Sequence, residues 1–127
     1  MGKEEKMCPV TITLRVIGGR WKPLILYHLF QDVKRFSELQ HALGRVSQKV
    51  LTQQLRELER DGIVRREVFP QVPPKVEYSL TALGRSLKPV IQQMSQWGQM
   101  FNAGTPPENG VTETLSSAAR NGVAPAA

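Results

Sequence analysis

The chain has few of the residues that build metal sites and disulfides. Its 127 residues include one cysteine, Cys8, and two histidines, His28 and His41. One cysteine cannot form a disulfide within the chain, and these three residues show none of the spacings that are familiar from zinc sites. We therefore predict no bound metal, no cofactor and no disulfide-stabilised core.

Long apolar segments are also missing. The sequence contains no run of about 18 apolar residues that could span a membrane. The N-terminal segment MGKEEKMCPV lacks the apolar stretch of a secretory signal. We expect a cytoplasmic protein without a membrane partner.

Acidic residues are fewer than basic ones. The sequence has 17 Lys and Arg but only 11 Asp and Glu, which gives a net charge of +6. Such an excess favours a polyanionic partner, although net charge alone does not distinguish nucleic acid from an anionic membrane surface. Sixteen of the basic residues but only nine of the acidic ones precede Gly104, so the excess belongs to the part that is expected to fold.

The composition changes at Gly104. Residues 104–127 are rich in Gly, Pro, Ser, Ala and Thr and contain no aromatic residue. They have too little apolar surface to offset the entropy that is lost on folding. We predict a disordered tail over residues 104–127, whereas residues 1–103 have the length of a single domain with one modest core.

Apolar spacing predicts three short helices in the first part of the chain, over about residues 10–17, 20–30 and 36–43. Ser37 and Gln40 have the spacing of a capping box, which indicates that the third helix begins close by. The apolar side of the second helix is assigned to Trp21, Leu24, Ile25, Tyr27 and Leu29.

Residues 46–62, VSQKVLTQQLRELERDG, have two chemically different faces at helical spacing. Leu51, Leu55 and Leu58 are spaced like a buried helix face, and Ser47 is suited to cap the helix. The other face carries cations, amides and a hydroxyl group, on Lys49, Thr52, Gln53, Arg56 and Arg60. Such side chains bind phosphates and base edges in a major groove that is wide enough for one α-helix. A solvated helix face has the same appearance when it is considered alone.

Two strands are predicted at residues 63–69 and 75–80, because Val76, Tyr78 and Leu80 alternate with polar residues. Prolines in the turn between them withhold backbone donors and stiffen it. The pattern is typical of a short β-hairpin.

A final helix is predicted over about residues 82–101, with Thr81 as its cap and a bend at Pro89. In chain order, three helices, a helix with two faces, a hairpin and a closing helix form a winged helix-turn-helix. The predicted fold class is mainly α with a small β wing (α+β), in which the third helix supports the fourth and the fourth inserts into DNA.

Five segments of this sequence resemble the HxlR family of bacterial transcription regulators. They are CPV at residues 8–10, IGGRWKPLIL at 17–26, RFSEL at 35–39, SQKVLTQQLRELERDG at 47–62 and VPPKVEYSLTALGRSL at 72–87. The resemblance runs over residues 8–101 and implies a homodimeric winged-helix regulator, more often a repressor, that lies on the bacterial nucleoid when bound. Arg20 stands where Lys is common in the family, and the tail lies outside the family pattern.

The predicted partner is double-stranded operator DNA, roughly palindromic, with half-sites about 34 Å apart or a multiple of that distance. Gln48, Thr52 and Gln53 are favoured for base contacts, and Lys49 and Arg56 for either bases or phosphates. The whole predicted DNA-binding set is Arg20, Arg35, Ser47, Gln48, Lys49, Thr52, Gln53, Arg56, Pro73 and Lys75. The two arginines outside the fourth helix are predicted to contact phosphates, and the wing is predicted to contact the DNA backbone or the minor groove. For both, the alternative is that the side chains are simply solvated.

Apolar residues on the first and last helices predict the homodimer interface. An apolar stripe as long as that of the last helix rarely stays uncovered, although Met94, Trp97 and Phe101 could instead fold back on their own domain. The predicted interface residues are Ile12, Leu14, Val16, Val90, Ile91, Met94, Trp97 and Phe101.

Cys8 precedes Pro9, a residue suited to the first position of a helix, so its thiol would lie at the helix N-terminus. Unsatisfied N–H groups and the helix dipole favour a reactive thiolate there. Similar HxlR-like proteins with this cysteine include sensors of oxidants or electrophiles, and we consider Cys8 a redox-sensing candidate with an oxidant or electrophile as effector. The alternative is an unreactive cysteine that packs as a small hydrophobe.

Two other functions compete with DNA binding. An enzyme with Cys8 as nucleophile would need a base and an orienting group, and neither histidine lies in a sequence context that suggests either role. We therefore predict that the chain is not an enzyme. The second alternative is a winged-helix protein-interaction module without DNA binding. The cationic face of the fourth helix argues against it, because the cores of protein interfaces are poor in Lys.

Overall fold

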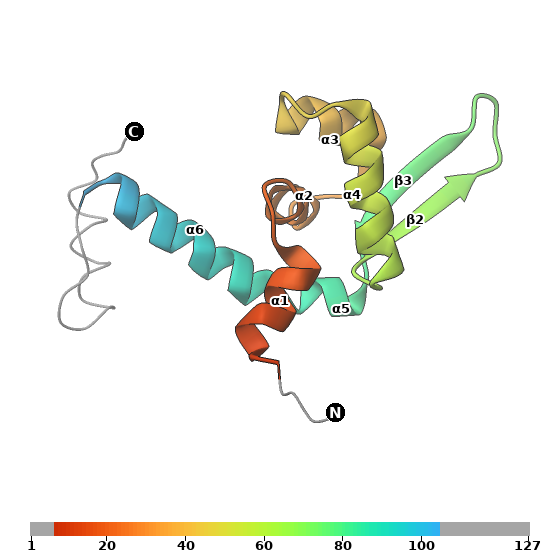
Figure 1. Ribbon diagram of the computed structural model, residues 1–127. Helices are drawn as coiled ribbons and strands as arrows, with labels where there is room; N and C mark the ends of the chain where they lie inside the picture. The colour runs from red at the N-terminus through yellow and green to blue at the C-terminus, as the bar shows by residue number, and fades with distance from the viewer. Residues whose placement is uncertain (1–6, 105–127) are drawn as a thin grey trace. The chain divides into compact units, whose positions relative to one another are not determined.

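In the computed structural model, which describes residues 7–104, helices make up most of the described residues and the strands form one small sheet (Figure 1). The elements in chain order are α1 (Pro9–Ile17), α2 (Lys22–Leu29), β1 (Lys34–Arg35), α3 (Phe36–Leu43), α4 (Gln48–Arg60), β2 (Val64–Phe69), β3 (Lys75–Leu80), α5 (Ala82–Arg85) and α6 (Lys88–Asn102). This order confirms the predicted fold class, a mainly helical winged helix-turn-helix with a small sheet. The chain divides after Lys88 into a winged-helix unit and a second unit that contains most of α6. The predicted tail lies outside the described residues except for Gly104.

The core of the winged-helix unit is built by α2, α3, α4 and the sheet. Leu51, Leu55 and Leu58 are at most 1% exposed, which confirms the predicted inner face of α4. Burial of one such side chain is worth about 1.5–3 kcal/mol. Other buried apolar residues of this unit are Ile17, Ile25, Leu26, Leu29, Leu39, Val46, Ile63, Val64, Tyr78 and Leu80.

The predicted apolar side of α2 was partly wrong. Leu24 is 42% exposed and Tyr27 is 46% exposed, whereas Leu26, which the prediction left out, is fully buried. In an eight-residue helix that is apolar almost throughout, spacing cannot decide which face is turned inward, and only packing against the neighbouring elements does so.

The strands form a three-stranded antiparallel sheet in the order β1-β3-β2. β2 and β3 are paired from Val64 with Leu80 to Phe69 with Lys75, and this hairpin projects away from the helices (Figure 1). β1 pairs Lys34 with Tyr78 and was not predicted, because two residues are too short to show any periodicity.

Hydrogen bonds fix where α3 and α4 begin. Ser47 Oγ accepts a hydrogen bond from the Val50 N–H at 3.1 Å, which confirms Ser47 as the cap of α4. At α3 the predicted capping box of Ser37 and Gln40 is wrong. Arg35 is the N-cap residue, so Ser37 already lies inside the first turn, and the Glu38 carboxylate accepts from the Arg35 N–H at 2.8 Å.

The predicted final helix is interrupted. Thr81 caps α5, because its Oγ1 accepts from the Gly84 N–H at 3.0 Å, but α5 ends at Arg85. α6 starts at Lys88, so Pro89 lies in the first turn of a new helix, where its missing N–H breaks no hydrogen bond. The predicted bend at Pro89 is therefore an interruption just before it. Within residues 7–104 no helix is both long and apolar enough to cross a membrane.

Candidate nucleic-acid interface

The outer face of α4 is open to solvent. Gln48, Lys49, Gln53 and Arg56 are exposed, and Thr52 is half-buried beside them. Together with Glu57 and Arg60 these residues line one broad depression on α4. The buried leucines on the opposite face hold this helix against the core, so the predicted polar stripe is presented on a rigid element.

A second recess, of about 280 Å³, lies between α4 and the sheet. It is lined by Phe36, Gln48, Thr52, Leu55, Arg56, Glu59, Arg66 and Tyr78. Arg66 is opposite Tyr78 in the β2–β3 register, so both side chains lie on the same face of the hairpin. Arg66 was not among the predicted contacts, although the hairpin register could have placed it on the side of α4.

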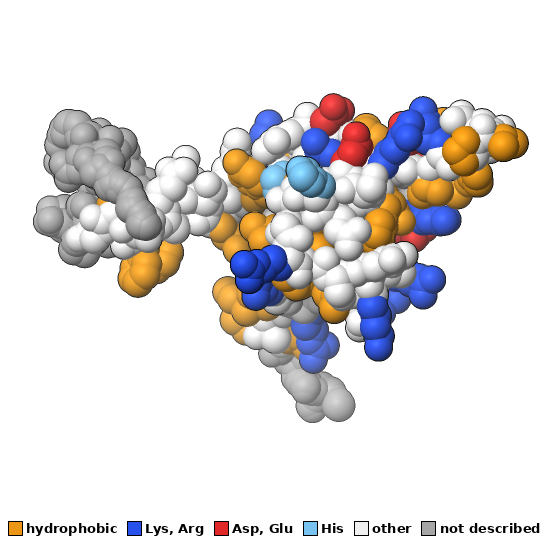
Figure 2. Space-filling view, turned by 90° about the horizontal axis from the view of Figure 1, so that it is seen from above, with side chains coloured by type: hydrophobic (Ala, Val, Ile, Leu, Met, Phe, Trp, Pro, Cys, Tyr) orange, Lys and Arg blue, Asp and Glu red, His pale blue; other side chains and the backbone are white. Residues whose placement is uncertain are grey.

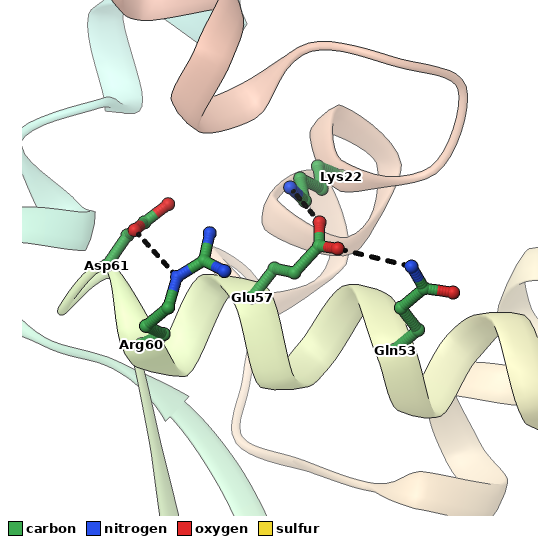
Figure 3. Close-up of polar contacts among 5 residues, drawn as sticks. All are labelled: Lys22, Gln53, Glu57, Arg60 and Asp61. Carbon is green, nitrogen blue, oxygen red and sulfur yellow. Dashed lines mark hydrogen bonds and ion pairs between the residues drawn. The ribbon is translucent and has the colours of Figure 1, made fainter.

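Three polar side chains connect α2 with the outer face of α4 (Figure 3). Lys22 Nζ lies 2.6 Å from Glu57 Oε1, and Gln53 Nε2 donates a hydrogen bond to Glu57 Oε2 at 3.3 Å. We call these residues the Lys22–Glu57–Gln53 relay. Lys22 is only 6% exposed, although it stands at the start of a helix whose apolar spacing gave no sign of an ion pair. The relay was missed because its two charged members are 35 positions apart in the chain.

The relay also affects the protonation of Glu57. The Lys22 ammonium first, and then the Gln53 amide, donate to its carboxylate and hold the pKa of Glu57 below its ordinary value. Glu57 is therefore a carboxylate at neutral pH and accepts from both neighbours.

The other predicted cations outside the wing have different surroundings. Arg60 Nε lies 3.4 Å from Asp61 Oδ1 at the end of α4, an exposed pair that holds the guanidinium weakly. The Arg20 guanidinium lies 4.6 Å from the centre of the Trp21 ring, and Arg20 and Arg35 are both exposed. These two arginines are therefore reachable by a large polyanion.

The wing carries Pro73 and Lys75 at and beside its tip, as the sequence predicted. Pro73 is exposed, but Lys75 is half-buried, with its Nζ 3.4 Å from Glu77 Oε2 and 4.8 Å from the centre of the Phe69 ring. An anion that binds Lys75 would compete with the Glu77 carboxylate for the ammonium. Figure 2 shows Lys and Arg side chains at several places around the winged-helix unit, with few acidic groups among them.

The residues predicted for a dimer interface lie on α1 and α6. On α1, Ile12 is 49% and Leu14 is 60% exposed, and Val16 is half-buried. On α6, four of the predicted residues are exposed: Val90, Met94, Trp97 and Phe101. The Trp97 and Phe101 rings stack with their centres 5.1 Å apart, whereas Ile91 is buried.

Cys8 is the N-cap residue of α1, as the sequence predicted from Pro9. Its thiol is free and exposed, and the side chain makes no capping hydrogen bond. An oxidant in solution can therefore reach the sulfur.

Comparison with known proteins agrees with this geometry. Residues 16–105 match the family model described as HxlR-like helix-turn-helix. The chain is 56% identical over 94 residues to the HTH-type transcriptional regulator YdeP of Bacillus subtilis, a match that covers 74% of this chain and 73% of YdeP.

Two solved structures are similar in fold and sequence. The redox regulator HypR in its oxidised form has a TM-score of 0.70 and 57% identity, over 72% of this chain and 94% of the HypR chain. Diamide-treated YodB from B. subtilis has a TM-score of 0.63 and 40% identity, over 73% of this chain and 93% of the YodB chain.

Proposed function

The chain belongs to the HxlR-like helix-turn-helix family and is a transcriptional regulator of the helix-turn-helix type, and from this premise we propose that it binds operator DNA sequence-specifically as a homodimer. The observation that carries this proposal is the outer face of α4. Lys49, Gln53 and Arg56 are exposed on a helix whose opposite face carries leucines that are at most 1% exposed. A rigid helix with amides and cations on its free side suits a major groove.

The wing and the neighbouring helices would position α4 on the duplex. Arg20, Arg35 and Lys75 are placed on other elements of the winged-helix unit and contribute phosphate contacts, which set register and add affinity without specifying bases. Lys75 exchanges the Glu77 carboxylate for a phosphate, and a partly exposed ion pair with its charges 3.4 Å apart resists such an exchange by little. Arg66 on β2 joins this set.

The exposed apolar residues of α1 and α6 support a homodimer. Two copies related by a two-fold axis would place their α4 helices in successive major grooves, about 34 Å apart, so the operator is roughly palindromic. We propose repression as the outcome, because a dimer on its operator occupies DNA that the transcription machinery needs. The protein would then act in the bacterial cytoplasm, on the nucleoid.

We propose further that oxidation of Cys8 changes operator affinity. The accessible thiol at the start of α1 supports this, as does the similarity to HypR, described as a redox regulator. With diamide as oxidant, two Cys8 thiols lose two electrons and two protons and form one disulfide between subunits. The azo group of diamide takes up the two electrons and the two protons and becomes a hydrazine.

Selection of bound fragments from random duplexes, followed by gel-shift titration over a range of salt concentrations, tests the proposed function. We expect enrichment of a symmetric motif with two half-sites, and affinity that falls linearly with salt on logarithmic axes. Enrichment of no sequence would refute specific binding. A single unrepeated half-site would refute the two-fold arrangement.

A further inference from the structure

The amide of Gln53 is held in one orientation by a residue one turn further along α4. Gln53 Nε2 donates to Glu57 Oε2 at 3.3 Å, and Figure 3 shows the amide oxygen on the side away from Glu57. A flipped amide would place its oxygen against the carboxylate, and two acceptors repel because neither has a hydrogen to donate. The orientation of this side chain follows from the charge of Glu57.

Glu57 is itself fixed by the buried end of the relay. Its Oε1 lies 2.6 Å from Lys22 Nζ, and Lys22 is 6% exposed, so little water reaches that lysine to take the place of the carboxylate. Loss of the partner would leave a buried charge unpaired, which is strongly unfavourable. The carboxylate therefore stays on Lys22 with one oxygen and offers the other to Gln53.

An amide held in this way presents a defined pattern. A glutamine amide has two N–H donors and one carbonyl acceptor. One N–H is used on Glu57, so the other N–H and the Oε1 acceptor remain side by side on the free end. Adenine presents the complementary pair in the major groove, an N7 acceptor next to an N6–H donor, whereas guanine presents two acceptors.

We propose that Lys22 and Glu57 are positioning residues for Gln53, and that Gln53 selects an adenine at one position of each operator half-site. This inference rests on the proposed function, in which the outer face of α4 enters the major groove. Docking removes water from the contact between Gln53 and Glu57, which lowers the local dielectric constant and strengthens the hydrogen bond. The buried Lys22–Glu57 ion pair thus fixes the direction in which the Gln53 amide meets the base edge.

The test is the base preference of matched variants in a selection from random duplexes. Wild type should prefer adenine to guanine roughly 5- to 150-fold at the position of Gln53, the range given by one bidentate contact. Gln53→Ala should lose that preference. Glu57→Gln should also lose most of the adenine preference. The new amide at position 57 can donate or accept a hydrogen bond, so the Gln53 amide can bind it in either of its two flipped orientations.

Asp32→Asn is the control. Asp32 is exposed in the segment after α2, outside the residues assigned to DNA binding, and the substitution changes the charge in the same way. The base profile of this variant at the Gln53 position should equal that of wild type. A general electrostatic effect would instead change Asp32→Asn and Glu57→Gln alike.

Because Glu57→Gln leaves the buried Lys22 ammonium without its carboxylate, the double variant Lys22→Met with Glu57→Gln is selected beside it. The double variant removes both charges, keeps the net charge of the chain and should show the same broadened preference. Thermal melting of each variant establishes that it is folded.

The outcomes separate the inference from the proposed function. A wild type that enriches no sequence refutes both. A second outcome is a wild type that enriches a symmetric motif in which the position that depends on Gln53 prefers a base other than adenine. This result overturns the inference alone, and it does so without any measurement on the Lys22 or Glu57 variants. Folded relay variants that keep the adenine preference overturn it too.

Discussion

Lys22 shows how one side chain can serve orientation more than stability. Its ammonium is nearly shielded from water and lies against Glu57 at 2.6 Å. Buried ion pairs rarely stabilise a fold more than apolar side chains of the same size, because both charges lose their hydration. We interpret the pair as a device that fixes the direction of polar groups on α4, where a displacement of one side chain would change which base edge it meets.

Arg56 is the exposed cation of α4 that lines both the depression on the helix and the recess beside the sheet. Arg56→Ala should weaken specific operator binding by roughly 1–3 kcal/mol, as loss of one base contact does. Gel-shift titration of the selected operator measures the change. Lys88→Ala, which removes an exposed positive charge from the start of α6, is the control and should leave specific affinity nearly unchanged. Equal losses in both variants would mean that net charge, not a base contact, is responsible.

Cys8 is accessible at the N-terminus of α1. Treatment with diamide should change the operator affinity of wild type by roughly 5- to 150-fold, the usual range for coupling between two sites. Cys8→Ser keeps the size of the side chain but cannot form the disulfide, so its affinity should not respond. Non-reducing electrophoresis measures cross-linking in parallel. A serine variant that still responds to diamide would exclude this thiol as the sensor.

The packing of α5 against the residue before β2 depends on one close backbone approach. A Cβ on Gly84 would lie 2.2 Å from the Ile63 carbonyl oxygen, so backbone would have to move. Gly84→Ala should therefore destabilise the protein by roughly 1–3 kcal/mol, measured as a lower midpoint in urea. Gly98→Ala is the control, because a Cβ at that position would have nothing within 4 Å and alanine favours the helix. A Gly84 variant as stable as wild type would contradict this close approach.

The contribution of the wing to DNA binding depends on whether Lys75 pairs with Glu77 or with a phosphate. Lys75→Ala should weaken binding to all DNA sequences alike and reduce the slope of log affinity against log salt by about 0.9, the value for one phosphate contact. Glu77→Gln removes the competing carboxylate and should strengthen binding. Titrations at several salt concentrations measure both effects. An unchanged slope for Lys75→Ala would show that this lysine stays on Glu77 in the complex.

At the scale of the whole molecule, the proposed function requires two copies of the winged-helix unit at a fixed separation. The candidate contacts are apolar residues exposed on α1 and α6, among which Trp97 is 55% and Phe101 is 70% exposed. Aromatic side chains of this size contribute strongly to interfaces once they are covered.

Trp97→Asp should convert the proposed dimer into a monomer at micromolar concentration, because a charge in the interface would be buried without a partner. Sedimentation velocity measures the mass. Affinity for the two-half-site operator should fall while single half-site binding persists. Gln92→Asp introduces the same charge elsewhere on α6 and should leave the dimer intact. A wild type that is monomeric under these conditions would refute the two-fold model.

The sequence predicted the winged helix-turn-helix because its signals are local and periodic. Leu51, Leu55 and Leu58 repeat at helical spacing, and the strand residues from Val76 to Leu80 alternate, so the two-faced helix and the hairpin could be assigned without knowledge of their neighbours. Ser47 could be named as a cap because capping acts within one turn. The exposed face of α4, which is the centre of the candidate site, follows from the same spacing.

Tertiary structure alone decided what depends on residues distant in the chain. It turned Leu26 inward and Tyr27 outward, paired β1 with β3, placed Arg66 beside α4 and brought Lys22 to Glu57. These outcomes arise from packing and electrostatics between elements, which no periodicity within one element records. The sequence determined that a polar helix face exists, and the fold determined how its side chains are aimed, because aim is set by contacts that form only when distant segments meet.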